Sequence, residues 1–378
     1  MTNTDSLEYH RKLKGKITVE PKARVRDKHD LSLAYTPGVA DASLAIVKDR
    51  NQVYNLTGKW NSVAIVTDGS AVLGLGDIGP EAALPVMEGK AVLFKEFAGI
   101  DAHPICLKTK NVKEIVETAV NISPTFGAIN LEDISAPRCF EIESELKKQL
   151  NIPVMHDDQW GTAMVVLAAL KNSLKLAKKE LRDARIVVNG IGAAGSAITY
   201  LLMDAGAKEI IICDREGIPD TQTFQDSHRK KLVEKTNPGK KAGKLGDALE
   251  KADVFIGVSA RGIISKDMVK SMAPKPIVFA MANPVPEIMP DEARKAGAYI
   301  IATGRSDFPN QVNNALGFPG IFRGLLDSRK SEISNGMLLA AADALAGTIA
   351  EKDLRPDYII PSPFDPNVVK EVAKTFMQ

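Results

Sequence analysis

The stretch Ile186-Val187-Val188-Asn189-Gly190-Ile191-Gly192-Ala193-Ala194-Gly195 decides the fold of the second half of the chain. It joins a short apolar run to a G-x-G-x-x-G pattern, and a helix-like segment follows over residues 196–205. A strand that enters such a glycine loop ahead of a helix is the fingerprint of a dinucleotide-binding βαβ unit. Gly190 permits the tight turn, Gly192 lets the backbone approach a pyrophosphate, and Gly195 lets the helix pack closely on the sheet.

A nucleotide phosphate would lie at the start of this helix, near Ala193 and Ala194, where free N–H groups and the helix dipole favour an anion. The next apolar run, 210–213, ends at Asp214, and 214 − 195 = 19 residues separate this acid from the last glycine of the pattern. That spacing is typical of a carboxylate that binds ribose. Asp214 would repel a 2′-phosphate whereas Arg215 would pair with one, so we expect NAD and leave NADP open.

Two pairs of adjacent acids stand upstream of this unit. Glu132-Asp133 closes the β-like run 126–131, and Asp157-Asp158 closes the run 152–156. Parallel strands bring their carboxyl ends to one edge of a sheet, so these four acids would repel one another unless a cation lies among them. Oxygen ligands of this kind indicate Mg²⁺ or Mn²⁺.

Each acid also has a simpler interpretation. A strand end can turn into solvent, and Asp133 can cap the next helix. Asp157 or Asp158 can likewise cap the helix expected after Gly161. We expect metal binding because the two pairs hold equivalent positions at successive strand ends. His156 alternates away from Asp157 along its run and is expected to be structural.

Lys90 and Tyr35 allow two interpretations each. Lys90 lies in the helix expected over 81–97 and is either solvated or partly buried beside the apolar residues 91–94. Burial would lower the pKa of its amine and make it a usable base. Tyr35 lies in a Pro-Gly loop, 33–38, where it is either exposed or packed over the core.

Short apolar strands alternate with helices along most of the chain, which predicts parallel sheets and an α/β fold. Strands are expected at 63–67, 105–107, 126–131, 152–156, 186–189, 210–213, 254–258, 277–280 and 299–302, and helices at 81–97, 112–120, 163–174, 196–205, 337–350 and 368–376. We expect two domains with a cleft between them: a substrate and metal domain (1–160) and a Rossmann-type, doubly wound nucleotide-binding domain (161–330). A helical segment (331–378) is expected to pack back on the first.

The composition excludes several classes of protein. With 378 residues, 44% hydrophobic and 25% charged, the chain is long enough for two globular domains. The 49 basic and 47 acidic side chains give a net charge of only +2, so neither nucleic acid nor a membrane surface is an expected partner. Three scattered cysteines fit a reducing compartment, and the start, 1–8, lacks the apolar core of a signal peptide. We expect a cytoplasmic protein.

Several motifs together resemble the malic enzymes of the compact bacterial type, over nearly the whole chain. These are LAYTPGVA at 33–40, VTDGS at 66–70, LGLGDIG at 73–79, EGK at 88–90, NLEDI at 130–134, HDDQWGT at 156–162, ANP at 282–284, NN at 313–314, FPG at 318–320 and IPSPFD at 360–365. The resemblance implies oxidative decarboxylation of L-malate to pyruvate and CO₂ with reduction of NAD or NADP. It also implies a homodimer.

The resemblance further implies roles for individual residues. Glu132, Asp133 and Asp158 would hold the metal, with Asp157 supporting them. Lys90 would deprotonate the C2 hydroxyl, and Tyr35 would protonate C3. Both would contact the substrate, as would Asn283 and Asn314 near the nicotinamide, so that Asn283 also borders the cofactor.

One position departs from the larger members of that family, which carry a carboxylate-binding arginine where this chain has Ala71. Another group must then bind that carboxylate of the substrate. Two rival functions also remain open. One is a lyase that decarboxylates oxaloacetate, or converts malate to lactate with the nicotinamide retained. The other is a regulator that binds a nucleotide without catalysis.

Overall fold

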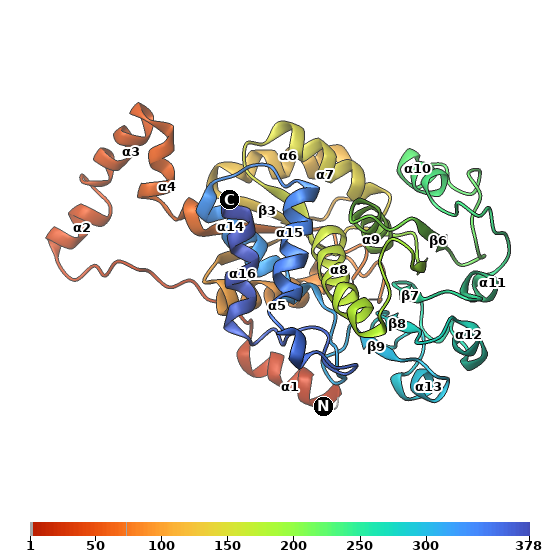
Figure 1. The fold of residues 1–378 in the computed structure, drawn as a ribbon. Helices are drawn as coiled ribbons and strands as arrows, with labels where there is room; N and C mark the ends of the chain where they lie inside the picture. The colour runs from red at the N-terminus through yellow and green to blue at the C-terminus, as the bar shows by residue number, and fades with distance from the viewer. Residues whose placement is uncertain (1–2, 73) are drawn as a thin grey trace.

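The computed structural model describes residues 3–72 and 74–378; Met1 and Thr2 of the N-terminal stretch and Leu73 of the LGLGDIG motif lie outside it. Two parallel sheets organise the chain (Figure 1). The first has the order β2-β1-β3-β4, and its strands are β1 (Ser62–Thr67), β2 (Asp101–Cys106), β3 (Ala128–Leu131) and β4 (Val154–His156). The second has the order β6-β5-β7-β8-β9, with β5 (Arg185–Asn189), β6 (Glu209–Cys213), β7 (Val254–Gly257), β8 (Ile277–Ala280) and β9 (Ile300–Thr303).

Both faces of each sheet are covered, because the central strands are apolar on both sides. In β1, Val63 and Ile65 pack into a core with α5 (Pro80–Ala98). The alternate residues, Ala64 and Val66, pack against α6 (Val112–Ile122) and α7 (Arg138–Gln149). The expected α/β architecture with parallel sheets is therefore confirmed.

The second sheet is enclosed in the same way. Ile186 and Val188 face α9 (Ala193–Asp204), and Val187 belongs to the core formed with the helices of the opposite face. Those and the remaining helices of this half are α10 (Ser227–Lys235), α11 (Leu245–Leu249), α12 (Lys266–Ser271) and α13 (Pro290–Lys295). This is a Rossmann-type arrangement, in which β6 and β7 flank the first strand β5 on opposite sides.

Helix α8 (Asp157–Ala177) runs between the two sheets and is buried on nearly all sides. It begins at Asp157, with His156 as its N-cap, and not after Gly161 as the sequence predicts. The acids at 157 and 158 therefore belong to the first helical turn. An N-terminal turn stabilises carboxylates through its free N–H groups and dipole.

Three C-terminal helices, α14 (Phe318–Ser328), α15 (Asn335–Ala346) and α16 (Pro366–Met377), complete the body. Helices α14 and α16 pack on each other and on α5, and α15 packs on α8. None of the described helices is long and apolar enough to cross a membrane.

The sequence interpretation missed the helices near the N-terminus. Helix α1 (Asn3–Leu13) lies on the body, whereas α2 (Lys28–Ala34) and α3 (Val39–Lys48) stand away from it (Figure 1). A 3-10 turn, η1 (Arg50–Gln52), and α4 (Val53–Leu56) lead back, and η2 (Gly58–Asn61) joins them to β1. We call residues 28–56 the arm. Its helices α2, α3 and α4 have only 7, 10 and 4 residues, which is shorter than the stretch over which helical periodicity is recognised in a sequence.

Candidate active site

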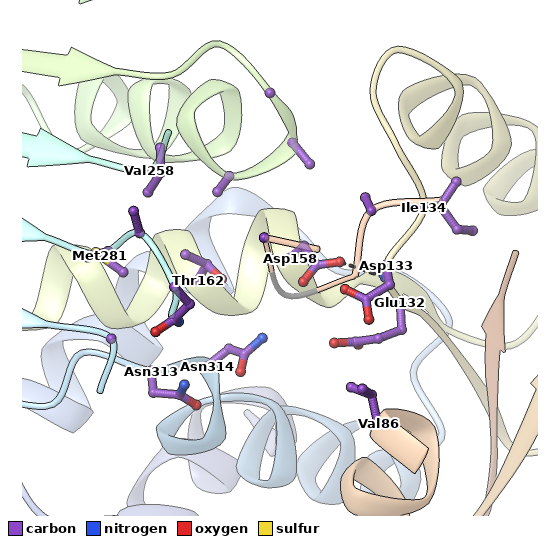
Figure 2. Close-up of a pocket in the computed structure, with 18 of the residues that line it drawn as sticks. Val86, Glu132, Asp133, Ile134, Asp158, Thr162, Val258, Met281, Asn313 and Asn314 are labelled. Atoms are coloured by element: carbon purple, nitrogen blue, oxygen red, sulfur yellow. Dashed lines mark hydrogen bonds between the residues drawn. The ribbon is translucent and has the colours of Figure 1, made fainter. Parts of the chain in front are cut away.

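The site lies where the carboxyl ends of both sheets face each other. In each sheet the first strand has neighbours on both sides that continue in opposite directions, which is where ligands bind in open α/β sheets. A cavity of about 1030 Å³ opens there (Figure 2). It is lined by Glu132 and Asp133 from one sheet and by Gly192 and Asp214 from the other. One cavity therefore reaches both the acid cluster and the glycine loop.

Glu132, Asp133 and Asp158 each offer an oxygen atom, and these atoms lie within 4.8 Å of one another. Glu132 and Asp133 follow β3, while Asp158 comes from the first turn of α8. Asp158 Oδ2 accepts a hydrogen bond of 2.8 Å from the backbone N–H of Asp133, which fixes the two segments together. The simpler interpretations, in which Asp133 caps a helix or the acids turn into solvent, are wrong.

Asp157 is fully buried beside this cluster. Its Oδ2 accepts from Lys90 Nζ, and its Oδ1 accepts no hydrogen bond from any described residue. Gly161, one turn on, makes room for it, because a Cβ there would lie 1.7 Å from Asp157 Oδ1. The structure thus sets Asp157 apart from the three clustered acids and against the lysine.

Lys90 lies on α5 with its side chain only 6% exposed. Its Nζ donates to Glu132 Oε1 at 2.7 Å and lies 4.1 Å from the ring centroid of Phe318. The expectation that burial lowers its pKa is wrong for the site in this state. Burial does act in that direction, but the carboxylates of Asp157 and Glu132 outweigh it and raise the pKa of Lys90.

The pKa values of the neighbouring carboxyl groups are also shifted upward. Burial raises the pKa of Asp157 to about 8, although Lys90 opposes the shift. Burial likewise raises the pKa values of Glu132 and Asp158. Three carboxyl groups, those of Asp157, Glu132 and Asp158, act on the one ammonium group of Lys90, and Asp133 adds a fourth acid to the cluster. A divalent cation therefore fits both the charge and the oxygen donors of Glu132, Asp133 and Asp158.

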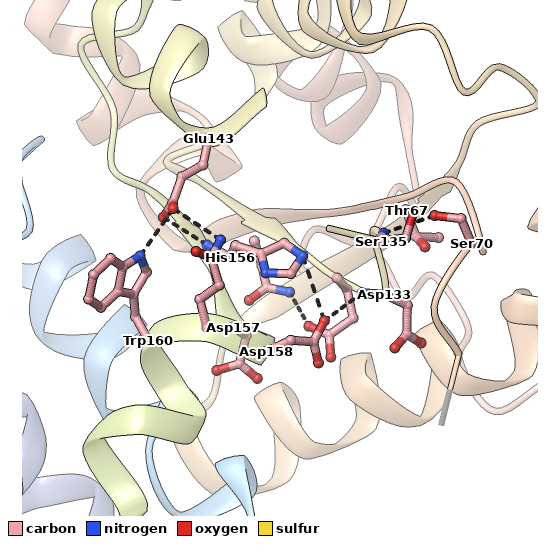
Figure 3. Close-up of polar contacts among 12 residues, drawn as sticks. Thr67, Ser70, Asp133, Ser135, Glu143, His156, Asp157, Asp158 and Trp160 are labelled. Atoms are coloured by element: carbon pink, nitrogen blue, oxygen red, sulfur yellow. Dashed lines mark hydrogen bonds and ion pairs between the residues drawn. The ribbon is translucent and has the colours of Figure 1, made fainter. Parts of the chain in front are cut away.

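The sequence interpretation missed a buried glutamate that holds this turn in place (Figure 3). Glu143 on α7 accepts from the backbone N–H of His156 at 3.1 Å and from Trp160 Nε1 at 3.0 Å. His156 is fully buried, and burial lowers its pKa. Its Nε2 lies 3.7 Å from Asp158 Oδ2. His156 is absent from the residues that line the cavity, in keeping with a structural role.

The glycine loop has the form that the sequence predicts. Gly190 has φ +114°, and a Cβ on Gly195 would lie 1.7 Å from the carbonyl oxygen of Gly190. At Gly192 a Cβ would meet nothing within 4 Å, because the residue faces the cavity. Helix α9 begins at Ala193 without a side-chain cap, and Ala193 and Ala194 line the cavity. These free N–H groups fit a pyrophosphate.

Asp214 lines the cavity at the end of β6, as expected, and its Oδ1 accepts from the backbone N–H of Glu216 at 2.8 Å. Arg215 does not line the cavity. Arg229 does, and the sequence interpretation missed it. Its Nε pairs with Asp226 at 2.6 Å, and its guanidinium lies 4.5 Å from the ring centroid of Phe224.

Asn283 and Asn314 both line the cavity, between the acid cluster and the glycine loop (Figure 2 labels Asn314). The two halves of the chain touch at Asn283, because a Cβ on Gly74 would lie 2.0 Å from its carbonyl oxygen. Only a glycine with φ +79° fits there.

Ala71 also lines the cavity, and so does Lys16, a cation that the sequence interpretation missed. Lys16 lies just beyond α1, and its Nζ donates to the carbonyl of Pro85 at 2.5 Å. A Cβ on Gly89 would lie 3.4 Å from that Nζ, which places Lys16 one residue from Lys90.

Tyr35 is the one predicted site residue that lies far from the others. It sits in the turn between α2 and α3 on the arm, with 67% of its surface exposed, and it does not line the cavity. The predicted loop with an exposed tyrosine is confirmed, but one chain does not bring it to Lys90.

Comparison with known proteins supports these features. Residues 14–147 match the family model "Malic enzyme, N-terminal domain", and residues 160–375 match "Malic enzyme, NAD binding domain". The chain is 54% identical to the bifunctional malic/malolactic enzyme of Bacillus subtilis, covering 99% of this chain and 93% of that one. It is 55% identical to the NAD-dependent malic enzyme of Geobacillus stearothermophilus, covering 96% and 76%.

A solved structure has the same fold. The crystal structure of the NAD-dependent malic enzyme from Thermotoga maritima matches with a TM-score of 0.95 and 50% identity, and 99% of each chain is covered.

Proposed function

The chain belongs to the malic enzyme family and catalyses the NAD(P)-dependent oxidative decarboxylation of malate, and on that premise we propose how its residues divide the work. One observation carries the assignment: three clustered carboxylates and a nucleotide-type glycine loop open into the same cavity. A hydride transfer alone needs no divalent metal, whereas the loss of CO₂ from a β-keto acid gains from one.

Glu132, Asp133 and Asp158 would hold Mg²⁺ or Mn²⁺, with Asp157 as their support. When bound, the ion supplies a Lewis acid for the carbonyl oxygen at C2 during decarboxylation. The support for this site is the 4.8 Å clustering of oxygen atoms and the excess of negative charge around Lys90.

Lys90 takes the proton of the C2 hydroxyl. It must first release its own proton, and Asp157 is the acceptor in contact with it. The raised pKa of Asp157, about 8, suits a carboxyl that holds a proton near neutral pH. Lys90 and Asp157 therefore act as a pair, in which Asp157 accepts the proton of Lys90. A lysine that acted alone would instead need burial to lower its own pKa.

We assign the pyrophosphate to Gly190, Gly192, Ala193, Ala194 and Gly195, and the adenosine ribose to Asp214. NAD is the preferred cofactor because Asp214, and not Arg215, lines the cavity. Arg229 lines the same end and would be the cation available to a 2′-phosphate, so NADP remains a usable alternative.

The substrate lies between the acid cluster and the nicotinamide, against Asn283 and Asn314. Ala71 provides no charge for a malate carboxylate. We assign that carboxylate to Lys16, the half-buried cation at the Gly89–Lys90 corner of the cavity.

We also propose that the first domain ends at residue 160, that the nucleotide-binding domain begins at residue 161, and that a helical segment begins at residue 331. The family models change between residues 147 and 160, and α16 packs on α5 of the first half. We place the enzyme in the cytoplasm as a homodimer. Three free cysteines, Cys106, Cys139 and Cys213, suit a reducing compartment.

The test is an assay of the purified protein with L-malate, Mn²⁺ and either NAD or NADP, with metal withheld as the control. We expect reduced cofactor and pyruvate in equal amounts, with higher kcat/KM for NAD. Absence of both products would overturn the assignment.

A malolactic activity is the second candidate, since a relative with 54% identity is named a bifunctional malic/malolactic enzyme. The same residues would serve it if the reduced cofactor stayed bound. Lactate formed from malate without a net rise in reduced cofactor would identify this reaction.

A further inference from the structure

One buried carboxyl group in the nucleotide-binding half has no part in the site described above. Glu287 lies in the segment between β8 and α13, and it is fully buried. None of the described residues forms an ion pair with it, and burial raises its pKa. A carboxyl group that is buried without a cation destabilises the fold unless its oxygen atoms accept hydrogen bonds. The partners of those oxygen atoms therefore show what Glu287 does.

Both oxygen atoms of Glu287 accept hydrogen bonds, and the donors belong to two different loops. Oε1 accepts from the backbone N–H of Ser259 at 3.1 Å, and Oε2 accepts from the backbone N–H of Ala282 at 3.0 Å. Ser259 lies in the loop that follows β7, and Ala282 lies in the loop that follows β8. These bonds favour the ionised carboxylate and oppose the effect of burial on its pKa. One side chain thus ties the two loops together.

The position of this carboxylate is closely fixed. A Cβ on Gly257, the last residue of β7, would lie 2.5 Å from both Cδ and Oε1 of Glu287, so the glycine leaves the space that the carboxylate fills. The backbone is held as well, because the carbonyls of Pro286 and Glu287 accept from the N–H groups of Gly262 and Ile264, each at 3.1 Å. Glu287 is therefore a rigid anchor for whatever its oxygen atoms hold.

The two loops form one wall of the cavity (Figure 2 labels a residue of each). Their residues that line it are Val258, Ser259, Met281, Ala282 and Asn283. Glu287 itself does not line the cavity. Its influence on a bound molecule therefore passes through the loops that it holds.

The first loop packs on the glycine loop. A Cβ on Gly190 would lie 2.8 Å from the carbonyl oxygen of Val258 and 3.2 Å from Cβ of Ser259. Asn189, the residue before Gly190, donates through Nδ2 to Ser259 Oγ at 2.5 Å. The position of Ser259 is thus linked to the loop that we assign to the pyrophosphate.

The second loop carries Asn283, which we assign to the substrate near the nicotinamide. It follows Ala282 directly, so the hydrogen bond from Ala282 to Glu287 also fixes where Asn283 begins. A Cβ on Gly304 would lie 2.9 Å from Asn283 Nδ2, and one on Gly74 would lie 2.0 Å from the carbonyl oxygen of Asn283. A shift of this loop would therefore change its contacts with both halves of the chain.

We propose that Glu287 is a positioning residue for hydride transfer. Its carboxylate fixes the spacing between the loop at 258–259, which packs on the pyrophosphate site, and the loop at 281–283, which contacts the substrate. That spacing keeps the nicotinamide in reach of the C2 hydrogen of malate. A displacement of about 1 Å between reacting groups can lower a rate by about 10²-fold. The inference rests on the proposed function, because it concerns the hydride step of that reaction.

A purely structural role is the alternative interpretation. Glu287 would then only satisfy two backbone N–H groups at the end of the sheet. Its replacement would lower the free energy of unfolding, but molecules that had folded would transfer hydride at the wild-type rate. The two interpretations therefore differ in the rate per folded molecule.

The test uses two variants that loosen the loops in different ways. Glu287→Gln keeps the size of the side chain, but its NH₂ group accepts no hydrogen bond, so one loop loses its anchor. Gly257→Ala keeps the charge and displaces the carboxylate. Glu292→Gln is the matched control, since its side chain is 50% exposed on α13. Folded protein is counted by titration with ADP-ribose, which lacks the nicotinamide.

The measured quantity is the single-turnover rate of cofactor reduction per ADP-ribose site, followed by stopped-flow absorbance with saturating malate and Mn²⁺. We expect both variants to lower this rate on the order of 10- to 100-fold and Glu292→Gln to leave it unchanged. Malate deuterated at C2 should slow the same step in wild type and variants, which identifies it as hydride transfer. The Mn²⁺ concentration for half-maximal activity should stay that of wild type, because the acid cluster is untouched.

Two results would overturn the proposal. One is a rate per ADP-ribose site within about twofold of wild type in either variant, far less than misplacement of the reacting groups costs. The other is a failure of both variants to give protein that binds ADP-ribose, because Glu287 would then be needed for folding. Wild-type protein without malate-dependent cofactor reduction contradicts the proposed function itself, so the two hypotheses fail in different ways.

Discussion

Lys90 and Tyr35 occupy opposite environments in this chain, although the family resemblance gives them linked roles. Lys90 is 6% exposed and contacts two carboxylates, whereas Tyr35 is 67% exposed on an arm that stands away from the body (Figure 1). The residues that line the cavity, Lys90 among them, are held in place by the packed core of a single chain. The arm is ordered locally, but its helices α2 and α3 contain no buried residue in one chain. Five experiments test this contrast, from the largest expected effect to the smallest.

Replacing the lysine has the largest expected effect. Lys90→Ala removes the base, and loss of a general base lowers kcat by about 10³- to 10⁴-fold. The binding of NAD, measured by fluorescence titration, is expected to persist because the glycine loop is untouched. Lys90→Arg is the control for charge, and it too should be inactive because arginine does not release a proton. A kcat within about tenfold of wild type would remove Lys90 from the site.

Replacing the tyrosine comes next. Tyr35→Phe is expected to lower kcat by about 10²- to 10³-fold, because only the protonation of C3 is affected. Thermal stability of the chain should not change, since the Tyr35 side chain is 67% exposed. The neighbouring exposed residue Thr36, changed to Ser, is the control. Unchanged turnover of Tyr35→Phe would leave the arm without a catalytic role.

The metal site is tested with Asp158→Asn. The change removes one anionic ligand and is expected to raise the Mn²⁺ concentration for half-maximal activity by about 10- to 100-fold. Asp214→Asn, at the other end of the cavity, is the control and should leave that concentration unchanged. Equal metal requirements for wild type and Asp158→Asn would exclude Asp158 as a ligand.

The part of the arm in the proposed homodimer is tested with Leu33→Asp, at a side chain that is 64% exposed in one chain. If the homodimer covers Leu33, a charge there is expected to weaken the dimer on the order of tenfold or more, about 1–2 kcal/mol. Specific activity should then fall on dilution and recover at high protein concentration. Leu7→Asp on α1, which is also exposed, is the matched control. Activity independent of protein concentration would separate the arm from dimer formation.

The smallest expected effect is a dependence of the free energy of unfolding on pH, caused by the buried carboxyl group of Asp157 beside the cavity. Asp157 has an ordinary pKa of 3.8 and a folded pKa of about 8, so the folded chain binds its proton more tightly than the unfolded chain. Stability of the metal-free protein therefore falls as pH rises across that window. The raised pKa of Lys90 acts only above its ordinary value of 10.5.

We expect the Tm measured in EDTA to fall by on the order of a few °C between pH 5.5 and 8. Added Mn²⁺ should raise the Tm by more at pH 8 than at pH 5.5, because the carboxyl groups that bind it are then ionised. Asp157→Asn should flatten the slope. If the Tm of the metal-free protein rises between pH 5.5 and 8, the raised pKa of Asp157 is wrong.

Much of the fold follows from local patterns in the sequence. The apolar runs that become β1, β5 and β8 are short, bounded by turn residues and buried on both faces, so they are recognised without knowledge of their neighbours. The glycine loop is recognised because each glycine meets a local requirement, either for a tight turn or for a close approach of the backbone. The arm is missed because its helices have no core to face in one chain, and the start of α8 is misplaced because burial and Glu143 hold the turn at Asp157.

By itself, the sequence determined that the chain is α/β, and it predicted a dinucleotide site at Gly190–Gly195 and a cation among the paired acids. These follow from periodicity, spacing and charge, which are properties of neighbours along the chain. Only the tertiary structure decided that Asp157 contacts Lys90 and stands apart from the three clustered acids, that Lys90 is held by carboxylates, and that Tyr35 lies away from the cavity of its own chain. These depend on which distant side chains meet in a low-dielectric space, and a linear pattern does not specify that.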